Sequence, residues 1–261
     1  PWLSSVDASL PNIKKALSLC NANDTIIFGG GEPTLRSDFL TLLSLFPEHS
    51  ILATDGLALH QSAVVQKLVE SGLRKVQIPI HSARADAHNW LVGIPGAHKR
   101  ACTAIKVLLR HGVDVRVESI LARPMTPYLE ETVAFLYRTG VRSINFRMLE
   151  RQGMATDSYI TLAPRFGLME PSLESAMRIA LRHGMTATVS GLPHCAAPQF
   201  ADFHTPSPKR ILPDGIPPPE STIEPRGWCE VCGDPCIGPS RAYTDLFGWT
   251  EFAEKRGALP P

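Results

Sequence analysis

The chain has 261 residues, which is long enough for one large domain or for a domain with an appendage. Its 26 basic and 25 acidic side chains nearly cancel, and no basic block stands out, so nucleic-acid binding is not favoured. The longest apolar runs are only as long as strands and no secretory signal is visible. We therefore expect a cytoplasmic protein that does not bind membranes.

Short strand-like runs alternate with longer amphipathic helices through the first 190 residues. Strands are predicted at 25–28, 50–54, 75–80, 113–121, 143–149 and 185–190, and helices at 10–20, 39–46, 62–72, 101–112, 129–140 and 172–184. This alternation predicts an α/β protein with a parallel sheet and helices outside it. The sheet is either open and doubly wound or forms most of a (β/α) barrel.

Three glycines at 29–31 follow the first predicted strand and are followed by Glu32 and Pro33. In both architectures binding sites lie at the carboxyl ends of the strands. Glycine there lets a ligand touch main-chain groups, although a tight turn without a ligand would use the same residues. The pattern is neither G-x-G-x-x-G nor a loop ending in G-K-[ST], so nucleotide-binding loops are poor interpretations. Pro33 holds the acid of Glu32 at the rim.

The stretch Gly30-Gly31-Glu32-Pro33-Thr34 resembles the second-strand motif of the radical S-adenosylmethionine enzymes. Thr54-Asp55-Gly56 is similar to the Thr-Asn-Gly of that family, and residues 81–113 resemble its "His-Asp, Leu-Thr-Gly, Pro-Gly" run with Asn89 and Val92 as substitutions. The resemblance covers roughly residues 8–150. It implies a partial TIM-like (β/α)6 barrel that lacks its first strand.

The resemblance also implies a cofactor site and a reaction. Gly30, Gly31, Glu32, Pro33 and Thr54 would bind S-adenosylmethionine, with backbone carbonyls and the Glu32 carboxylate receiving its ammonium group. In the family, a [4Fe–4S] cluster reductively cleaves this cosubstrate, and the 5′-deoxyadenosyl radical abstracts hydrogen from a substrate. The pattern identifies no catalytic residue of the chain itself.

Two features depart from the family pattern. The Cys-x3-Cys-x2-Cys loop that holds the catalytic cluster is absent, because only Cys20 precedes the glycines. We expect this loop and the first strand to lie upstream of Pro1, and we expect the chain alone to be inactive. Pro79 occupies the place of a serine that often contacts the cosubstrate. His81 or Ser82 could substitute for it, although the plainer interpretation of His81 is a solvated histidine at the rim.

The six cysteines are unevenly placed. Cys20 and Cys102 occur singly in helix-like patterns and are interpreted as small buried hydrophobic residues. The other four, Cys195, Cys229, Cys232 and Cys236, fall in a proline-rich segment that we predict to be a separate unit, 191–261, after a barrel core at 1–190. Without a secretory signal, such a cluster indicates a metal site before disulfides.

Cys229-x2-Cys232-x3-Cys236 places three thiolates on one short loop, with Cys195 available as a fourth ligand. The spacing is compatible with zinc as well as with an iron–sulfur cluster. Resemblance to the SPASM/twitch-like extensions of the family implies an auxiliary [4Fe–4S] cluster on these four cysteines. His194, beside Cys195, is a further candidate ligand, although a histidine in an exposed loop is the plainer interpretation.

The sequence therefore predicts a radical S-adenosylmethionine enzyme with an unknown substrate, for which a peptide or protein is the candidate. Its expected electron donor is a flavodoxin or ferredoxin. A non-catalytic relative that keeps the barrel and the metal-binding tail and binds a partner is the alternative. A plain α/β protein with a structural zinc tail would leave the motif at 30–34 unexplained.

Overall fold

The computed structural model describes residues 8–21, 25–45, 50–153, 155–196, 198–205, 236 and 238–255, with side chains as far as residue 252. Its centre is one six-stranded parallel sheet with the strand order β1-β2-β3-β4-β5-β6. The strands are β1 Ile27–Phe28, β2 Ile51–Ala53, β3 Lys75–Pro79, β4 Asp114–Leu121, β5 Ser143–Met148 and β6 Thr186–Ser190. Each strand pairs with the next along the chain, as expected of repeated βα units.

Ten α-helices and four short 3-10 helices lie in the described residues. The α-helices are α1 Leu10–Leu17, α2 Phe39–Leu43, α3 Ser62–Glu70, α4 Ala85–Val92, α5 Ala97–Arg110, α6 Leu129–Thr139, α7 Ala155–Leu162, α8 Phe166–Arg182, α9 Arg241–Phe247 and α10 Thr250–Lys255. The 3-10 helices are η1 Pro33–Leu35, η2 Thr126–Tyr128, η3 His194–Ala196 and η4 Pro198–Phe203. No helix of the described part is both long and apolar enough to cross a membrane.

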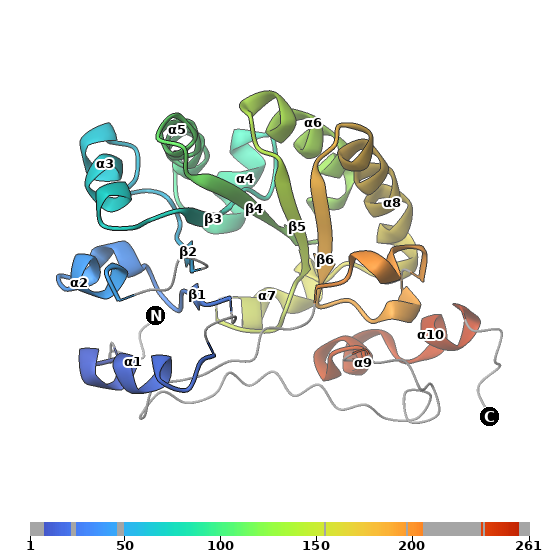
Figure 1. The fold of residues 1–261 in the computed structure, drawn as a ribbon. Helices are drawn as coiled ribbons and strands as arrows, with labels where there is room; N and C mark the ends of the chain where they lie inside the picture. Colours follow the sequence, from blue (N-terminus) through green and yellow to red (C-terminus); the bar gives the residue numbers. More distant parts are fainter. Residues whose placement is uncertain are drawn as a thin grey trace.

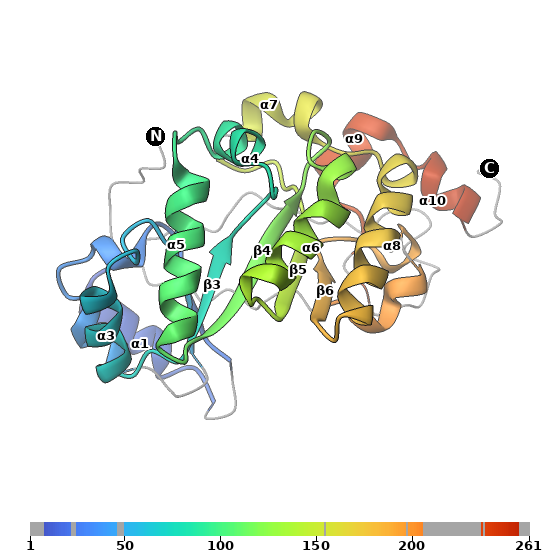
Figure 2. The ribbon, with the colours of Figure 1, turned by 90° about the horizontal axis from the view of Figure 1, so that it is seen from above.

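Helices α3, α5, α6 and α8 form an arc over one face of the sheet (Figure 1). Figure 2 shows α4 and α7 at the edge where β3 and β5 end. Because all six strands are parallel, their carboxyl ends share this edge, which also receives the glycine turn after β1. The fold is the α/β architecture that the alternation predicts, and it agrees with a partial TIM-like barrel.

The hydrophobic core lies between the sheet and the helix arc. Along β4, buried and partly exposed residues alternate strictly, so Val115 and Val117 enter the core while Arg116 and Glu118 point to the opposite face. The helices contribute apolar residues to the same cluster, among them Leu108 of α5. The sheet therefore has an apolar face under the helices and a second, polar face, which we call the concave face.

All six predicted strands are present, and most boundaries agree within two residues. Several helices differ from the prediction. Residues 81–100, expected to be a loop, contain α4 and the start of α5; α8 begins at Phe166 rather than at residue 172 and includes Pro171. Pro171 lies beyond the first turn of α8, so its missing N–H group removes one i→i−4 hydrogen bond of this helix.

The C-terminal segment contains two helices that the sequence analysis did not predict, and they pack on the barrel core. The ring of Tyr243 stacks on Phe166 with centroids 4.0 Å apart. Its hydroxyl accepts a hydrogen bond from the Phe166 amide at 2.9 Å and donates one to Glu251. Glu251 also accepts from the amide of Gly167, so its carboxylate lies at the N-terminus of α8. The division at residue 190/191 stays a prediction.

Candidate functional site

The glycine turn after β1 exposes bare backbone at the carboxyl edge of the sheet. Gly30 has φ of +115°, a conformation that residues with a Cβ rarely adopt, and both Gly30 and Gly31 are exposed. No described atom lies within 4 Å of the position that a Cβ would take at either residue. The backbone at these two glycines is therefore exposed to solvent.

Glu32 joins the ends of β1 and β2. Its Oε1 accepts hydrogen bonds from the Thr34 amide at 3.1 Å, from the Thr34 hydroxyl, and from the Thr54 hydroxyl at 2.7 Å. Its Oε2 accepts from the Asp55 amide at 2.7 Å. The carboxylate thus caps η1 and fastens it to the neighbouring strand. This internal role was not foreseen from the sequence, which offered only the role of ligand for the cosubstrate.

The segment after β2 forms the other wall of this edge. Thr54 is buried, and its hydroxyl also accepts from the amide of Gly56 at 3.1 Å. The Asp55 carboxylate accepts from the Leu57 amide at 2.8 Å. Burial, and secondarily the nearby Glu32 carboxylate, raise the pKa of Asp55. The structure therefore brings Gly30, Gly31, Glu32, Pro33 and Thr54 together in one compact edge, which we call the Glu32 edge.

His81 lies at the end of β3, where its interpretation as a solvated histidine is wrong. The side chain is only 5% exposed, and burial lowers its pKa to about 4. Its Nδ1 accepts from the Ile120 amide at 3.2 Å, and its own amide donates to Nδ1 of the buried His88 at 3.2 Å. Ser82 is fully buried as well. Neither side chain offers an exposed group to replace the serine expected near Pro79.

Polar side chains cover the concave face next to the Glu32 edge. Gln77 donates to Glu118 at 3.0 Å, and Arg147 lies 3.7 Å from Glu118 and 2.8 Å from Glu150. Asn145, 2% exposed, donates to Ser190 and accepts from Thr188, both at 2.9 Å. This set of residues, with Arg116, was missed from the sequence. The signal was present, because charged side chains occupy alternate positions of the predicted strand at 113–121.

The predicted metal ligands are only partly described. Cys195 lies in η3, half-buried against the core, and α10 contacts that turn. Cys236 is half-buried, and its sulfur accepts from the Gly238 amide at 3.4 Å. Cys229 and Cys232 lie outside the described residues. Within the described ranges, no group of three or more His, Cys, Asp or Glu side chains has the arrangement of a metal site.

The remaining candidates differ from the sequence-based interpretation in detail. His194 is half-buried rather than exposed, and its ring contacts that of His204 with centroids 4.6 Å apart. Cys20 lies beyond the end of α1, a helix with no buried residue, so its interpretation as a buried helical residue is wrong. Cys102 does lie in α5, where burial raises the pKa of its thiol to about 11, as expected of an unreactive packed cysteine.

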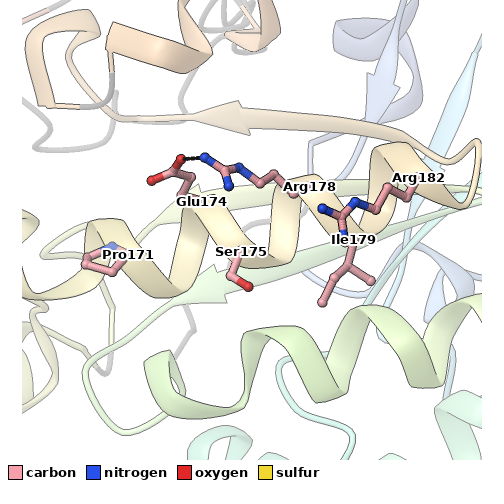
Figure 3. Close-up of a pocket in the computed structure, with 6 residues that line it drawn as sticks. All are labelled: Pro171, Glu174, Ser175, Arg178, Ile179 and Arg182. Carbon is pink, nitrogen blue, oxygen red and sulfur yellow. Dashed lines mark hydrogen bonds and ion pairs between the residues drawn. The ribbon is translucent and has the colours of Figure 1, made fainter.

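A surface hollow on α8 lies away from the Glu32 edge. Figure 3 shows its lining: Pro171, Glu174, Ser175, Arg178, Ile179 and Arg182. Glu174 and Arg178 pair with each other across one helical turn, as exposed side chains commonly do. The hollow belongs to the helix layer, on the other side of the sheet from the concave face. It contains none of the residues that the sequence analysis selected.

No family model matches the chain. Two curated relatives are an AdoMet-dependent heme synthase of Oleidesulfovibrio alaskensis, 26% identical over 136 residues, and the mycofactocin maturase MftC of Mycolicibacterium smegmatis, 29% identical over 140 residues. The matches cover 51% and 52% of this chain and 35% of each relative. The chain therefore spans about a third of the length of these two relatives.

Among solved structures, Streptococcus suis SuiB bound to the precursor peptide SuiA has the same fold, with a TM-score of 0.58 and 16% sequence identity. The alignment covers 76% of this chain and 47% of SuiB. The matches to curated relatives and the structural alignment agree with the motif at Gly30–Thr34 at the carboxyl edge of a parallel sheet. The matches to curated relatives confirm the resemblance to the radical S-adenosylmethionine family, and the structural alignment confirms the α/β fold.

Proposed function

We propose that this chain is the substrate-binding and S-adenosylmethionine-binding part of a radical S-adenosylmethionine enzyme. The observation that carries the proposal is the Glu32 edge. It combines exposed glycine backbone with a carboxylate that the protein already holds in one position. Both features are needed to receive an ammonium group, which donates hydrogen bonds and carries a positive charge.

The donors around Glu32 leave its Oε2 as the atom for a ligand. Oε1 already accepts three hydrogen bonds, whereas Oε2 accepts one from the described residues, the amide of Asp55. A carboxylate oxygen has two lone pairs, so Oε2 retains capacity for one donor of the cosubstrate. The carbonyl groups of Gly30 and Gly31 would accept the remaining ammonium hydrogens. A charge-assisted hydrogen bond of this kind contributes about 1.5–3 kcal/mol.

The described residues do not themselves supply ligands for a catalytic cluster, since no suitable group of three side chains occurs among them. In the proposed enzyme the cluster is held by residues outside the described part of the chain. When both are bound, cluster and cosubstrate supply a 5′-deoxyadenosyl radical that abstracts hydrogen from the substrate. The role of this chain would be to hold the methionine ammonium group and to line the space in which the substrate lies.

The full-length protein tests the proposal. After anaerobic reconstitution with iron and sulfide and reduction, we expect cleavage of S-adenosylmethionine to 5′-deoxyadenosine. Glu32→Ala should weaken cosubstrate affinity at least tenfold by calorimetry, which is about 1.4 kcal/mol. Glu70→Ala, an exposed acid on α3, is the matched control and should bind as wild type. Unchanged affinity in Glu32→Ala would refute the role of Glu32. No cleavage by a reconstituted protein would instead favour the non-catalytic binding protein.

The tail is proposed to hold an auxiliary iron–sulfur cluster through Cys195, Cys229, Cys232 and Cys236. The half-buried position of Cys195 and the contact of its turn, η3, with α10 support this assignment, because α10 lies close to the turn that contains one of the four cysteines. Replacing the three late cysteines by alanine should remove that iron, and Cys102→Ala should leave it. Zinc without labile sulfide in protein purified without oxygen would refute the cluster.

A peptide or protein is the proposed substrate class, and its support is the likeness to SuiB, whose structure contains a precursor peptide. A flavodoxin or ferredoxin would supply the electron, and the protein would work in the cytoplasm. Incubation of the reduced enzyme with candidate peptides and deuterated solvent, followed by mass spectrometry, tests this part separately.

A further inference from the structure

Arg116 is a guanidinium on the concave face whose donors are largely unused. It lies on β4, in the row of the sheet that contains Gln77 and Ser143. Among the described residues its Nη2 donates one hydrogen bond, to the Thr188 hydroxyl at 3.3 Å. Its Nε is buried and has no hydrogen-bond partner among the described residues. A guanidinium has five N–H donors, so most of its binding capacity remains.

The charges around Arg116 differ from those around the neighbouring arginine. Arg147 has two carboxylates within 4 Å, those of Glu118 and Glu150. Arg116 has no ion pair of that kind within the described ranges, and Glu118 acts on it only as a more distant charge. Burial lowers the pKa of Arg116, because folding removes part of the water around the guanidinium. Within the described residues, no adjacent carboxylate compensates for this lost hydration. Partly buried cations in proteins are normally paired.

The neighbours of Arg116 hold the guanidinium in place. Thr188 donates its hydroxyl hydrogen to Asn145, so its oxygen is free to accept from Arg116. Asn145 is itself fixed by Ser190. This chain of hydrogen bonds directs the side chain over β5 towards β6 and reduces the loss of side-chain entropy when a ligand binds.

We propose that Arg116 binds a carboxylate of the substrate on the concave face. A carboxylate matches the planar donor fork of a guanidinium. Glu118, two residues further along the same strand, makes a monoanion more favourable than a dianion such as phosphate, because repulsion from its carboxylate grows with the charge of the ligand. This inference rests on the proposed function, in which the substrate is a peptide or protein, and the carboxylate is a group of that substrate.

The position of Arg116 separates this carboxylate from that of S-adenosylmethionine. Ala53 of β2, Gln77 and Arg116 stand in one row of the sheet, so β4 lies two strand spacings from β2, or about 10 Å. The guanidinium points further away, towards β6. The ammonium and carboxylate of one amino acid are joined through a single carbon atom. A molecule whose ammonium lies at the Glu32 edge therefore cannot place its own carboxylate on Arg116.

Acetate is a suitable probe, and the arginine Nε–H signals in nitrogen-15 NMR spectra report on its binding. In the full chain at constant ionic strength, acetate should shift the Arg116 signal in a saturable manner, and chloride should not. Arg116→Gln should weaken acetate binding at least tenfold, as measured from the backbone amide signals of β4, which this variant retains. Arg178→Gln, on the exposed surface of α8, is the matched control and should bind acetate as wild type. Acetate binding by Arg116→Gln within twofold of wild type, or a shift equal to that with chloride, overturns the proposal. Tighter binding of phosphate than of acetate overturns the assignment to a carboxylate.

A stability measurement excludes an internal partner. If a carboxylate of the chain itself paired with Arg116, Arg116→Gln would lower the free energy of unfolding in urea by more than the Arg178→Gln control does. We expect Arg116→Gln to be as stable as wild type or more stable, because it removes a partly buried charge. Neither experiment needs a cluster, a reductant or S-adenosylmethionine. A failed acetate titration together with intact cosubstrate cleavage would therefore refute this inference and leave the proposed function standing.

Discussion

Removing the Glu32 carboxylate should destabilise the fold before any cofactor is considered. In Glu32→Ala, the Thr34 amide and hydroxyl, the Thr54 hydroxyl and the Asp55 amide all lose their acceptor. The donors of Thr34 are near solvent and can turn to water, whereas Thr54 is only 4% exposed. Counting mainly the bonds from Thr54 and Asp55, we expect a loss of about 2–4 kcal/mol in the free energy of unfolding.

Two further variants make the prediction specific. Glu32→Gln keeps one carbonyl oxygen but turns an NH2 group towards a protein donor, so it should lose about 1–2 kcal/mol, less than Glu32→Ala. Thr54→Val keeps the side-chain shape and removes the hydroxyl that joins Glu32 to the amide of Gly56, with a loss of about 1–3 kcal/mol.

The assay is equilibrium unfolding in urea without S-adenosylmethionine, followed by tryptophan fluorescence and by circular dichroism to check for a two-state transition. Glu70→Ala on the exposed end of α3 serves as the control. If Glu32→Ala remained within 0.5 kcal/mol (about the range of ordinary surface substitutions) of wild type, the carboxylate would not be fastening β1 to β2. A loss of cosubstrate affinity in that variant could then be assigned to the ligand contact alone.

Three other changes test separate parts of the structure. Gly30→Ala should lower the free energy of unfolding in urea by about 1–2 kcal/mol, because φ of Gly30 is +115°. Gly31 has no positive φ and is equally free of neighbours, so Gly31→Ala should lower it by less than half as much. Equal losses would contradict the backbone argument. Burial lowers the pKa of His81 from 6.5 to about 4. As pH falls through this range, His81 is protonated in the unfolded chain but stays neutral in the folded chain, so stability that is present above pH 6.5 is lost. Between pH 7.5 and 5, wild type should lose about 2 kcal/mol more than His81→Gln, and parallel pH profiles would count against burial of a neutral ring. Tyr243→Phe should cost about 1–3 kcal/mol and speed proteolysis at residues 238–252, because the buried amide of Phe166 loses its acceptor; unchanged digestion would show that the helices dock without this bond.

The strands could be predicted because each is short, contains apolar residues and is bounded by turn residues. At 113–121 charged and apolar residues alternate, and the two faces of β4 alternate in the same way. The position of the Glu32 edge followed from the topology, since parallel strands end at a common edge. The burial of His81 could not be predicted in the same way. It depends on the Ile120 amide from the next strand and on the ring of His88 from α4, a helix that the sequence analysis treated as a loop.

The hydrogen bonds of Glu32 and of Arg116 depend on residues far apart in the sequence. Glu32 meets Thr54 across 22 positions, and Arg116 meets Thr188 across 72. A local pattern shows that each residue is polar and near a strand end or on the face away from the core. It does not show which donors and acceptors meet, and that pairing decides whether a charge is used within the protein or is available to a ligand.

The docking of α9 and α10 also affects how costly it is to assemble a metal site in the tail. Tyr243 and Glu251 attach the chain after Gly238 to the start of α8, and Thr205 attaches the chain before residue 206 to β6 through the carbonyl of Val189. Both ends of the intervening segment are therefore anchored by packing and hydrogen bonds in the protein itself. Closing a loop of this length costs about 3 kcal/mol of chain entropy in its length-dependent part. This entropy is already lost when the protein folds, so a metal ion bound there would not have to bring the two ends together, and less of its binding free energy would be offset. Although Tyr243 is not a ligand, Tyr243→Phe should therefore weaken metal retention by the site proposed in the tail.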